Sequence, residues 1–408
     1  MKQIKSNRDI LTHRYIEYLD KIKKGKNLTN SEMLKGDALY VDNYHDLIEE
    51  IAELSGKNKD ILLFFRGQGE DFRNESNETT ILPTIYRNIR DFEIKLDTLN
   101  FASNLLISQI KKKYDRKPGV LDLKQKKHLQ WAILQHYGVY DTPLLDVTQS
   151  IRVACSFATQ NGSEYSYIYI IGMPYYTNRI STNSEDDIVN IRLLSISPPM
   201  ALRPHYQEAF AIGSEFIRFD TENINEFDFA NRLICKYKIP NNDVFWNKSD
   251  KHREYPISLD LLLPKEDSML AICNEIRKIV LLYHEVLSLR DVVKSTIDTT
   301  SDIFHLGYQS SLIRTVETSS ATYIKNYYKI NDKLEEIQKY IISKSDVDGN
   351  SIYDDLKKVK EYFSIMNTTD NRNLLFGSVY ANYPYSPDPY KDDIIDYLTK
   401  PLYRIKKL

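Results

Sequence analysis

Short apolar runs bounded by turn-forming residues recur between residues 61 and 239, and they restrict the fold more than any other feature of this chain. The first of them, Ile61–Phe65, is continuous and has the pattern of a buried strand. Because segments of helical periodicity separate these runs, we expect an α+β fold with a mixed sheet and flanking helices. The other strand candidates are Tyr165–Met173, Ile188–Leu194, Ala209–Ile212, Glu215–Phe219 and Leu233–Ile239.

Apolar residues at helical spacing predict the helices around this sheet. Gly56 is expected to end the helix that runs through Leu54, and Thr148 and Ser150 are candidate N-caps for the helix that ends at Ala158. The expected helices are Ile10–Lys23, one from Asp42 or Asn43 through Leu54, Phe92–Tyr114, Lys124–Tyr137, and one ending at Ala158 after a short extended stretch from Asp146.

The strand signal fades after Leu270, and helical patterns dominate the rest of the chain. Prolines within Pro384–Lys391 predict a loop before a last helix. We therefore expect a helical C-terminal extension of the sheet domain. Its predicted helices are Leu270–Leu289, Ile324–Ser343 and Ser351–Ile365.

The charge balance of the whole chain does not favour binding to a polyanion such as nucleic acid. The 55 lysines and arginines nearly match the 57 aspartates and glutamates, for a formal charge of -2. Net charge therefore gives no indication of nucleic acid binding. The basic run from Lys111 to Lys127 could form a local patch, although a solvated helical face is the favoured explanation.

Cysteine content and hydropathy indicate the compartment. The three cysteines, Cys155, Cys235 and Cys273, lie far apart in apolar settings, which predicts neither a disulfide framework nor a zinc site. The N-terminal segment lacks the apolar stretch of a signal peptide, and there is no run of about 18 apolar residues that could span a bilayer. We therefore expect a cytoplasmic protein with no membrane partner.

Arg66 is the first candidate for a functional side chain, because it follows the first apolar run directly. A guanidinium beside Gly67, which lets a ligand approach closely, suits forked recognition of a phosphate or carboxylate. A structural ion pair with Glu70, Asp71 or Asp146 is the alternative, and the residues alone leave both open.

The segment His136–Ser150 gathers imidazole, phenol, carboxylate and hydroxyl groups between two predicted helices, where sites are often built. His136 could act as a base or bind a ligand, or it could simply cap its helix. Asp146 could act on a substrate or cap the next helix. A third polar cluster, with Arg203, Gln207 and Glu208, comes just before a strand candidate. There is no motif for a metal site, a Walker-type phosphate loop or a Ser-His-Asp hydrolase elbow.

Together these blocks resemble the FRG domain, whose members often look like components of bacterial toxin or phage-defence loci. The resemblance covers about residues 42–275, which leaves a helical lead-in at 1–41 and a helical C-terminal region at 276–408. The matching blocks, in order, are Phe65-Arg66-Gly67-Gln68, Leu82–Arg87, Gln135–Gly138 with Leu144–Thr148 and Ala154–Ala158, and Arg203 with Gln207.

A more distant likeness is to ADP-ribosyltransferases of the Arg-Ser-Glu type. In these, a strand ends in Arg-Gly, a Ser/Thr-containing strand leads into a helix, and a later strand provides the catalytic glutamate. Arg66-Gly67, Thr148–Ser150 and Gln207–Glu208 follow that order. The likeness implies NAD as cofactor, with Arg66 on the pyrophosphate, Thr148 or Ser150 at the nicotinamide pocket, and Glu208 or Glu215 stabilising an oxocarbenium-like centre. Gln207 stands at the family position and has no charge.

Two interpretations of function follow from these resemblances. The first is an NAD-using ADP-ribosyltransferase or NAD glycohydrolase that modifies a macromolecular target as a bacterial toxin or antiviral effector. The second is a non-catalytic sensor module that binds a nucleotide or protein, with a partner held by the helical C-terminal region. A scaffold role is a third reading. The predicted cofactor-binding residues are Arg66, Gly67, Gln68, Asp146, Thr148 and Ser150, and the catalytic candidates are His136, Gln207, Glu208 and Glu215.

Overall fold

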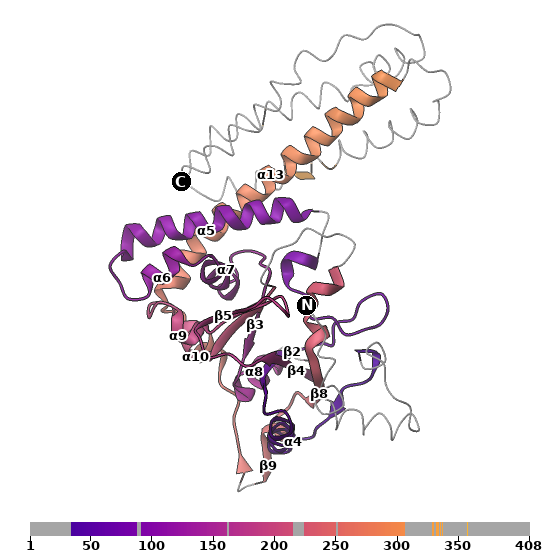
Figure 1. The fold of residues 1–408 in the computed structure, drawn as a ribbon, viewed down its shortest axis with the longest axis vertical. Helices are drawn as coiled ribbons and strands as arrows, with labels where there is room; N and C mark the ends of the chain where they lie inside the picture. The colour runs from indigo at the N-terminus through magenta and orange to yellow at the C-terminus, as the bar shows by residue number, and fades with distance from the viewer. Residues whose placement is uncertain are drawn as a thin grey trace. The chain divides into compact units, whose positions relative to one another are not determined.

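The computed structural model describes residues 34–87, 91–160, 163–214, 224–249 and 252–306, together with residues 329, 332, 333, 335, 337 and 357 (Figure 1). Two compact units divide the chain, one within residues 1–92 and 106–274 and the other within residues 93–105 and 275–408. The main sheet belongs to the first unit.

An eight-stranded mixed sheet forms the frame of the first unit, in the order β1-β8-β4-β2-β3-β7-β6-β5. Strands β1 and β8 are parallel, and the other neighbours in this sheet are antiparallel. This architecture confirms the predicted α+β class. The strands are β1 Leu39–Tyr40, β2 Ile61–Gln68, β3 Leu144–Thr148, β4 Tyr165–Pro174, β5 Ile180–Asn183, β6 Ile188–Ile191, β7 Ala209–Gly213 and β8 Leu233–Pro240, with β9 Asn247–Ser249 and β10 His252–Arg253 in a separate pair.

The helices agree with the strongest predicted periodicities. The prediction of Phe92–Tyr114 is confirmed to the residue, and Asn43 caps α4 by accepting a hydrogen bond from the Asp46 amide. The helices are α4 Tyr44–Lys57, α5 Phe92–Tyr114, α6 Val120–Gln125, α7 Lys127–His136, α8 Ile151–Ala158, α9 Leu193–Ile196, α10 Leu202–Tyr206, α11 Asp243–Trp246, α12 Leu259–Leu262 and α13 Ser268–Leu306, with short 3-10 turns at Thr84–Arg87, Ile224–Phe227 and Phe229–Arg232.

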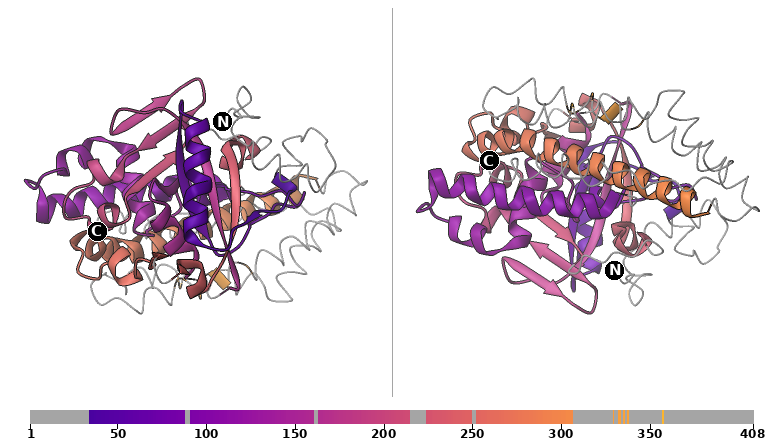
Figure 2. Two further views of the ribbon diagram at one scale, coloured as in Figure 1. Left: turned by 90° about the horizontal axis from the view of Figure 1, so that it is seen from below. Right: turned by 90° about the horizontal axis from the view of Figure 1, so that it is seen from above.

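Different apolar clusters bury the two faces of the sheet. Leu63 and Phe65 of β2 pack in one cluster with side chains of α4 and α8, and Figure 2 shows α4 lying across the strands. Phe64 points the other way, into a cluster with side chains of β3, β4 and β7. Because β2 is covered on both faces, its sequence is continuously apolar and does not alternate.

Strands β2 and β3 are paired with each other over far fewer residues than each is with its other neighbour in the sheet. Strand β2 pairs with β4 over eight residue pairs, and β3 pairs with β7 over five. Between β2 and β3, only Phe65 and Thr148 are paired. The sheet therefore parts beyond this pair, between the end of β2 and the middle of β3.

Around this junction, the extended stretch from Asp146 and the helix that ends at Ala158 are confirmed, with Ser150 at the N-cap of α8. Asp146 does not cap this helix, because the segment from Leu144 to Thr148 pairs with β7. Strand β2 continues past Phe65 to Gln68, since its ladder with β4 extends that far. Arg66 and Gly67 therefore lie within a strand.

Three further boundaries differ from the predictions. Helix α4 passes through Gly56 and ends at Lys57. The helix expected over Lys124–Tyr137 is broken at Lys126, whose extended backbone separates α6 from α7. The strand expected over Ile188–Leu194 ends at Ile191, where α9 follows.

The remaining expectations concern the second unit and residues outside the description. Helices α5 and α13 lie side by side, with Phe101 stacked on Tyr283 at 4.2 Å between ring centroids (Figure 2). Within the described residues, no helix has both the length and the apolar character needed to cross a bilayer. Predictions at Ile10–Lys23, Glu215–Phe219, Ile324–Ser343, Ser351–Ile365 and Pro384–Lys391 lie wholly or mostly outside the described residues.

Candidate functional site

A cavity of about 550 Å³ lies where β2 and β3 part. Arg66 and Gln68 line it from β2, and Asp146 lines it from β3. His136 lies at the end of α7, and Gln207 lies in the short connection between α10 and β7. Polar residues from three separated stretches of the sequence thus meet in one concavity. The volume falls within the range of about 300–1,000 Å³ that is usual for ligand pockets.

Arg66 supplies a fixed positive charge to this cavity. Its Nη1 donates a hydrogen bond to the backbone oxygen of Asp146 at 2.7 Å, across the gap between the strands. Burial lowers the pKa of the guanidinium, and the nearby Asp146 carboxylate opposes that shift. Arginine remains charged in proteins. Since the Arg66 Nε is buried with no hydrogen-bond partner in the described part of the chain, one donor is left for a ligand.

His136 and Asp146 form a dyad at the cavity wall. The His136 Nδ1 lies 3.5 Å from the Asp146 Oδ1, and the side chains are 3% and 34% exposed. The other ring nitrogen, Nε2, is buried and has no partner among the described residues. A neutral imidazole whose Nδ1 faces a carboxylate holds its hydrogen there, so Nε2 is free to accept one. This arrangement can orient a base toward a ligand.

Gln68 adds a third buried polar atom without a protein partner. Like the Arg66 Nε and the His136 Nε2, its Oε1 is buried and has no hydrogen-bond partner within the described residues. Buried polar groups in folded proteins usually have partners. Of ten exceptions among the described residues, three belong to side chains that line this cavity, where a bound ligand with matching groups would satisfy them.

Thr148 and Gln207 line the cavity, but their polar groups hold the backbone. The Thr148 hydroxyl lies 3.0 Å from the Gln207 carbonyl and 3.1 Å from that of Glu208, and it accepts from the Ser150 amide at 3.0 Å. The Gln207 Nε2 donates to the Leu262 carbonyl at 2.7 Å. These bonds fix the start of β7 beside the cavity, so both residues position the site.

The other predicted site residues lie away from the lining. Ser150 is at the N-cap of α8, makes no side-chain capping bond there, and does not line the cavity. Glu208 is exposed, has a left-handed backbone with φ of 45°, and is also outside the lining. Glu215 lies outside the described residues. Of the two predicted catalytic glutamates, only Glu208 belongs to the described residues, and it is not part of the cavity wall.

Gly67 serves close packing of β2 on α8. A Cβ at this position would lie 1.9 Å from the Ala154 carbonyl oxygen, whereas a Cβ at Gly56 would meet nothing within 4 Å. We expect Gly67→Ala to lower the free energy of unfolding by about 1–3 kcal/mol, as overpacking does. Gly56→Ala, the matched control within α4, should raise it by up to about 1 kcal/mol. Urea denaturation measures both, and equal effects of the two substitutions would contradict this role.

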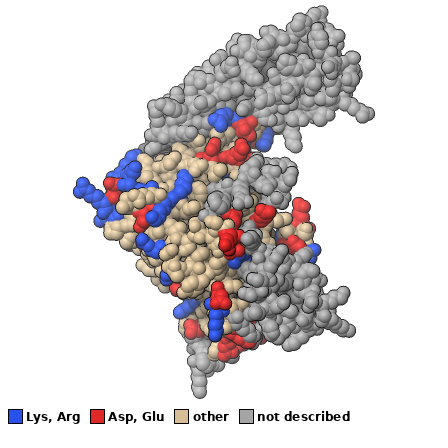
Figure 3. Space-filling view, viewed as in Figure 1, with Lys and Arg blue, Asp and Glu red and all other residues tan. Residues whose placement is uncertain are grey.

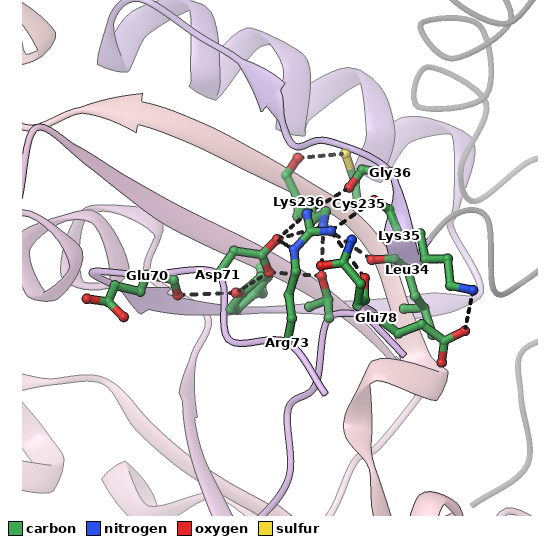
Figure 4. A network of polar contacts seen from close by, with 12 residues as sticks. Leu34, Lys35, Gly36, Glu70, Asp71, Arg73, Glu78, Cys235 and Lys236 are labelled. Atoms are coloured by element: carbon green, nitrogen blue, oxygen red, sulfur yellow. Dashed lines mark hydrogen bonds and ion pairs between the residues drawn. The ribbon is translucent and has the colours of Figure 1, made fainter. Parts of the chain in front are cut away.

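A buried ionic network anchors one edge of the cavity (Figure 4). Asp71 lies between Glu70 and Phe72, which both line the cavity. In Figure 4 the Glu70 side chain points away from the network that holds Asp71. The Asp71 carboxylate thereby fixes the rim segment. It contacts Lys236 Nζ at 2.9 Å, the Thr79 hydroxyl at 2.8 Å, the Tyr169 hydroxyl at 2.9 Å and Arg73 Nη2 at 2.9 Å.

Several lining residues escaped the sequence predictions of site residues. Phe72 is 51% exposed at the rim, and Leu263 follows α12. Neither stands in a recognisable motif, because only the tertiary fold brings them to β2. Phe157, which lies within the block Ala154–Ala158, also lines the cavity. Within the described residues, there is no group of three or more His, Cys, Asp or Glu placed to hold a metal ion.

The basic run from Lys111 to Lys127, which begins in the last turn of α5, carries acidic residues among its basic ones. Lys124 contacts Asp115 at 2.8 Å, and Lys126 contacts Asp122 at 3.1 Å. In Figure 3, blue side chains gather at the left edge of the view with red ones among them. These pairs support the reading of a solvated helical face.

Comparison with known proteins gives one match. The family model of the FRG domain matches residues 62–166, from β2 to the start of β4, and so includes Arg66, His136 and Asp146. This confirms the predicted resemblance over that segment, whereas its extension to Arg203 and Gln207 stays a prediction. No curated protein and no solved structure matches the chain.

Proposed function

We propose that this chain, which contains an FRG domain, binds an NAD-type dinucleotide in the cavity between β2 and β3 and cleaves or transfers its ADP-ribose. One observation supports this most. The Arg-Gly, Thr/Ser-helix and Gln-Glu blocks, whose order resembles ADP-ribosyltransferases, lie on or beside three neighbouring strands, β2, β3 and β7, around a single cavity.

The chemistry of the cavity suits a dinucleotide. The Arg66 guanidinium, with its unpaired Nε, is a donor for a pyrophosphate oxygen. Apolar walls from Phe65, Phe157 and Leu263 can cover a base or nicotinamide ring. The described lining thus pairs one cation with ring-sized apolar surface.

Asp146 is our candidate for the negative charge that stabilises an oxocarbenium-like centre. It lines the cavity, whereas Glu208 is exposed outside it and Gln207 is uncharged. The backbone of Asp146 is held by Arg66, and its carboxylate faces His136. A carboxylate fixed in this way requires little reorganisation when charge develops on the substrate.

The direct test combines NAD binding with nicotinamide release. We expect NAD to stabilise the full chain against heat, by about 2.7 kcal/mol at a hundred times its dissociation constant. Nicotinamide release should fall by about 100-fold or more in Asp146→Asn with NAD stabilisation retained, as when a charge-stabilising group is removed. Glu185→Gln, at an exposed position in the β5–β6 turn, is the control and should behave as wild type.

The results distinguish Asp146 from Glu208 as the charge-stabilising carboxylate, and they also test the proposed function. Loss of release in Glu208→Gln but not in Asp146→Asn would assign the role to the glutamate of the motif order. Absence of both NAD stabilisation and nicotinamide release, with and without extract of bacterial or infected cells, would contradict the proposed function.

Binding without turnover is the second candidate, and the position of Gln207 favours it. At the place where the motif order expects a catalytic glutamate, the cavity presents an amide that is already bonded to the Leu262 carbonyl. The chain would then sense a nucleotide and signal to a protein partner. Stabilisation by NAD with no nicotinamide release would support this reading over the enzyme.

The toxin or anti-phage role implied by the family resemblance is also a proposal. It would act in the bacterial cytoplasm, and a partner bound by the helical C-terminal region would deliver the trigger. Cells expressing the wild-type chain should resist phage or grow poorly, and cells expressing Arg66→Ala should not. Identical growth and plaque counts in both would contradict it.

A further inference from the structure

We infer that the ligand of the cavity presents hydroxyl groups beside its anionic group, as a sugar phosphate does, and that Gln68 and His136 select it for them. The inference rests on the proposed function and names the part of the ligand that the site recognises. It comes from the donor and acceptor character of three buried atoms that lack partners within the described residues, the Arg66 Nε, the Gln68 Oε1 and the His136 Nε2, all on side chains that line the cavity.

Gln68 requires a donor from the ligand. Its Oε1 is buried in the cavity wall and receives no hydrogen bond within the described residues. A carboxamide oxygen can only accept, so a phosphate or carboxylate oxygen does not satisfy it. A ligand hydroxyl does.

His136 sets the same requirement from another element. Its side chain is 3% exposed, and its Nδ1 faces the Asp146 carboxylate at 3.5 Å. When the ring is neutral, its hydrogen lies on the Nδ1 that faces this carboxylate, and the unpaired Nε2 is then an acceptor on a side chain that lines the cavity. Two acceptors, from β2 and α7, thus line one cavity.

Arg66 requires the opposite kind of group. A guanidinium has only donors, and its unpaired Nε needs an anionic or carbonyl oxygen. A bare phosphate satisfies Arg66 and leaves both acceptors unpaired. A phosphorylated sugar satisfies all three, because its phosphate accepts from Arg66 while its hydroxyls donate to Gln68 and His136.

Calorimetric titration of the full chain with a graded ligand series tests this inference. The probes are pyrophosphate, ribose 5-phosphate, ADP-ribose, and ADP-ribose analogues that each lack one ribose hydroxyl. We expect ADP-ribose to bind most tightly and at least one deoxy analogue to bind about tenfold more weakly, the loss expected for one hydrogen bond with a buried acceptor left unpaired. Pyrophosphate should bind weakly and depend on Arg66.

Matched variants assign the selection to the two acceptors. In Gln68→Met, the difference between ADP-ribose and one deoxy analogue should shrink from about tenfold to less than about twofold. His136→Gln, which keeps a polar group near the Nε2 position, should retain more discrimination than His136→Asn, which does not reach it. Gln125→Met, at an exposed glutamine of α6, is the control and should bind every probe as wild type does.

Each outcome supports or overturns the inference. Equal affinity for ADP-ribose, all its deoxy analogues and pyrophosphate would overturn it while leaving nucleotide binding intact. Hydroxyl-dependent binding of ribose 5-phosphate that requires Gln68, without binding of NAD or ADP-ribose, would support it and contradict the proposed dinucleotide. If no probe binds the folded wild-type chain, the result contradicts both this inference and the proposed function.

Discussion

Arg66→Met should leave the protein folded and reduce its affinity for NAD or ADP-ribose by at least about 100-fold. A charge-assisted hydrogen bond contributes about 1.5–3 kcal/mol, and each 1.4 kcal/mol is a factor of about ten in affinity. The same substitution removes a buried cation and one hydrogen bond, to the Asp146 carbonyl, which lies at an open cavity where water can take its place. We therefore expect the free energy of unfolding without ligand to change by less than about 1 kcal/mol.

Arg232→Met is the matched comparison, because Arg232 is a buried arginine with structural partners. Its Nε donates to the Gly172 carbonyl at 2.8 Å, and its Nη1 lies 3.6 Å from the Asp186 carboxylate. Replacing it should lower the free energy of unfolding by about 1–3 kcal/mol, since it leaves a buried carbonyl unpaired. Thermal unfolding measures the stability of both variants, and calorimetric titration measures their affinity for the ligand. A large loss of stability in Arg66→Met with ligand affinity intact would make Arg66 a structural residue.

Asp71→Asn should be among the most destabilising substitutions in the sheet domain. It keeps the shape of the side chain but leaves Lys236, whose side chain is 0% exposed, as a buried cation with no carboxylate at 2.9 Å. Breaking a buried ion pair by removing one partner costs about 3–5 kcal/mol. Chemical denaturation should show this loss, and Asp71→Asn with Lys236→Met should be less destabilised than the sum of the single variants. Simple additivity would show that the two groups are not coupled.

The effect of Asp71 should depend on pH. Burial alone would raise the pKa of Asp71, but hydrogen bonds from Lys236, Thr79 and Tyr169 outweigh it, so the pKa lies below its usual value. A carboxyl group with a depressed pKa in the folded state stabilises the fold above its unfolded pKa of about 3.9, and this contribution is lost as the pH falls further. The stability difference between wild type and Asp71→Asn should therefore be full at pH 7 and shrink below about pH 4. A constant difference down to pH 2 would contradict the ionic origin.

Local sequence was enough to single out Arg66, His136 and Asp146, which the fold brings to one cavity, because each stands in a polar block beside an apolar element. The strand ladder could not be foreseen in the same way. Asp146 and Thr148 look like helix caps locally, yet pairing with β7 places them in a strand. Tertiary contacts override local preference in such cases.

The positions of Gln207 and Glu208 show a second limit. Adjacent in sequence, one faces the cavity and the other faces solvent, because the chain turns through a left-handed conformation at Glu208 before β7 begins. No spacing rule distinguishes the two residues. The bond from Gln207 to the Leu262 carbonyl, which fixes the choice, joins residues 55 positions apart.

Few backbone hydrogen bonds join the two halves of the sheet, because β2 and β3 share one residue pair. The β2–β4 ladder and the β3–β7 ladder each keep their own backbone hydrogen bonds if the Phe65–Thr148 pair opens. The width of the groove is therefore set by side chains, among them the Arg66 bond to Asp146 and the apolar cluster in which Phe64 of β2 packs against Phe210 of β7 at 4.9 Å between ring centroids. A bulkier ligand would have to displace this packing, so substitutions at Phe64 or Phe210 should alter the size of ligand that the groove accepts.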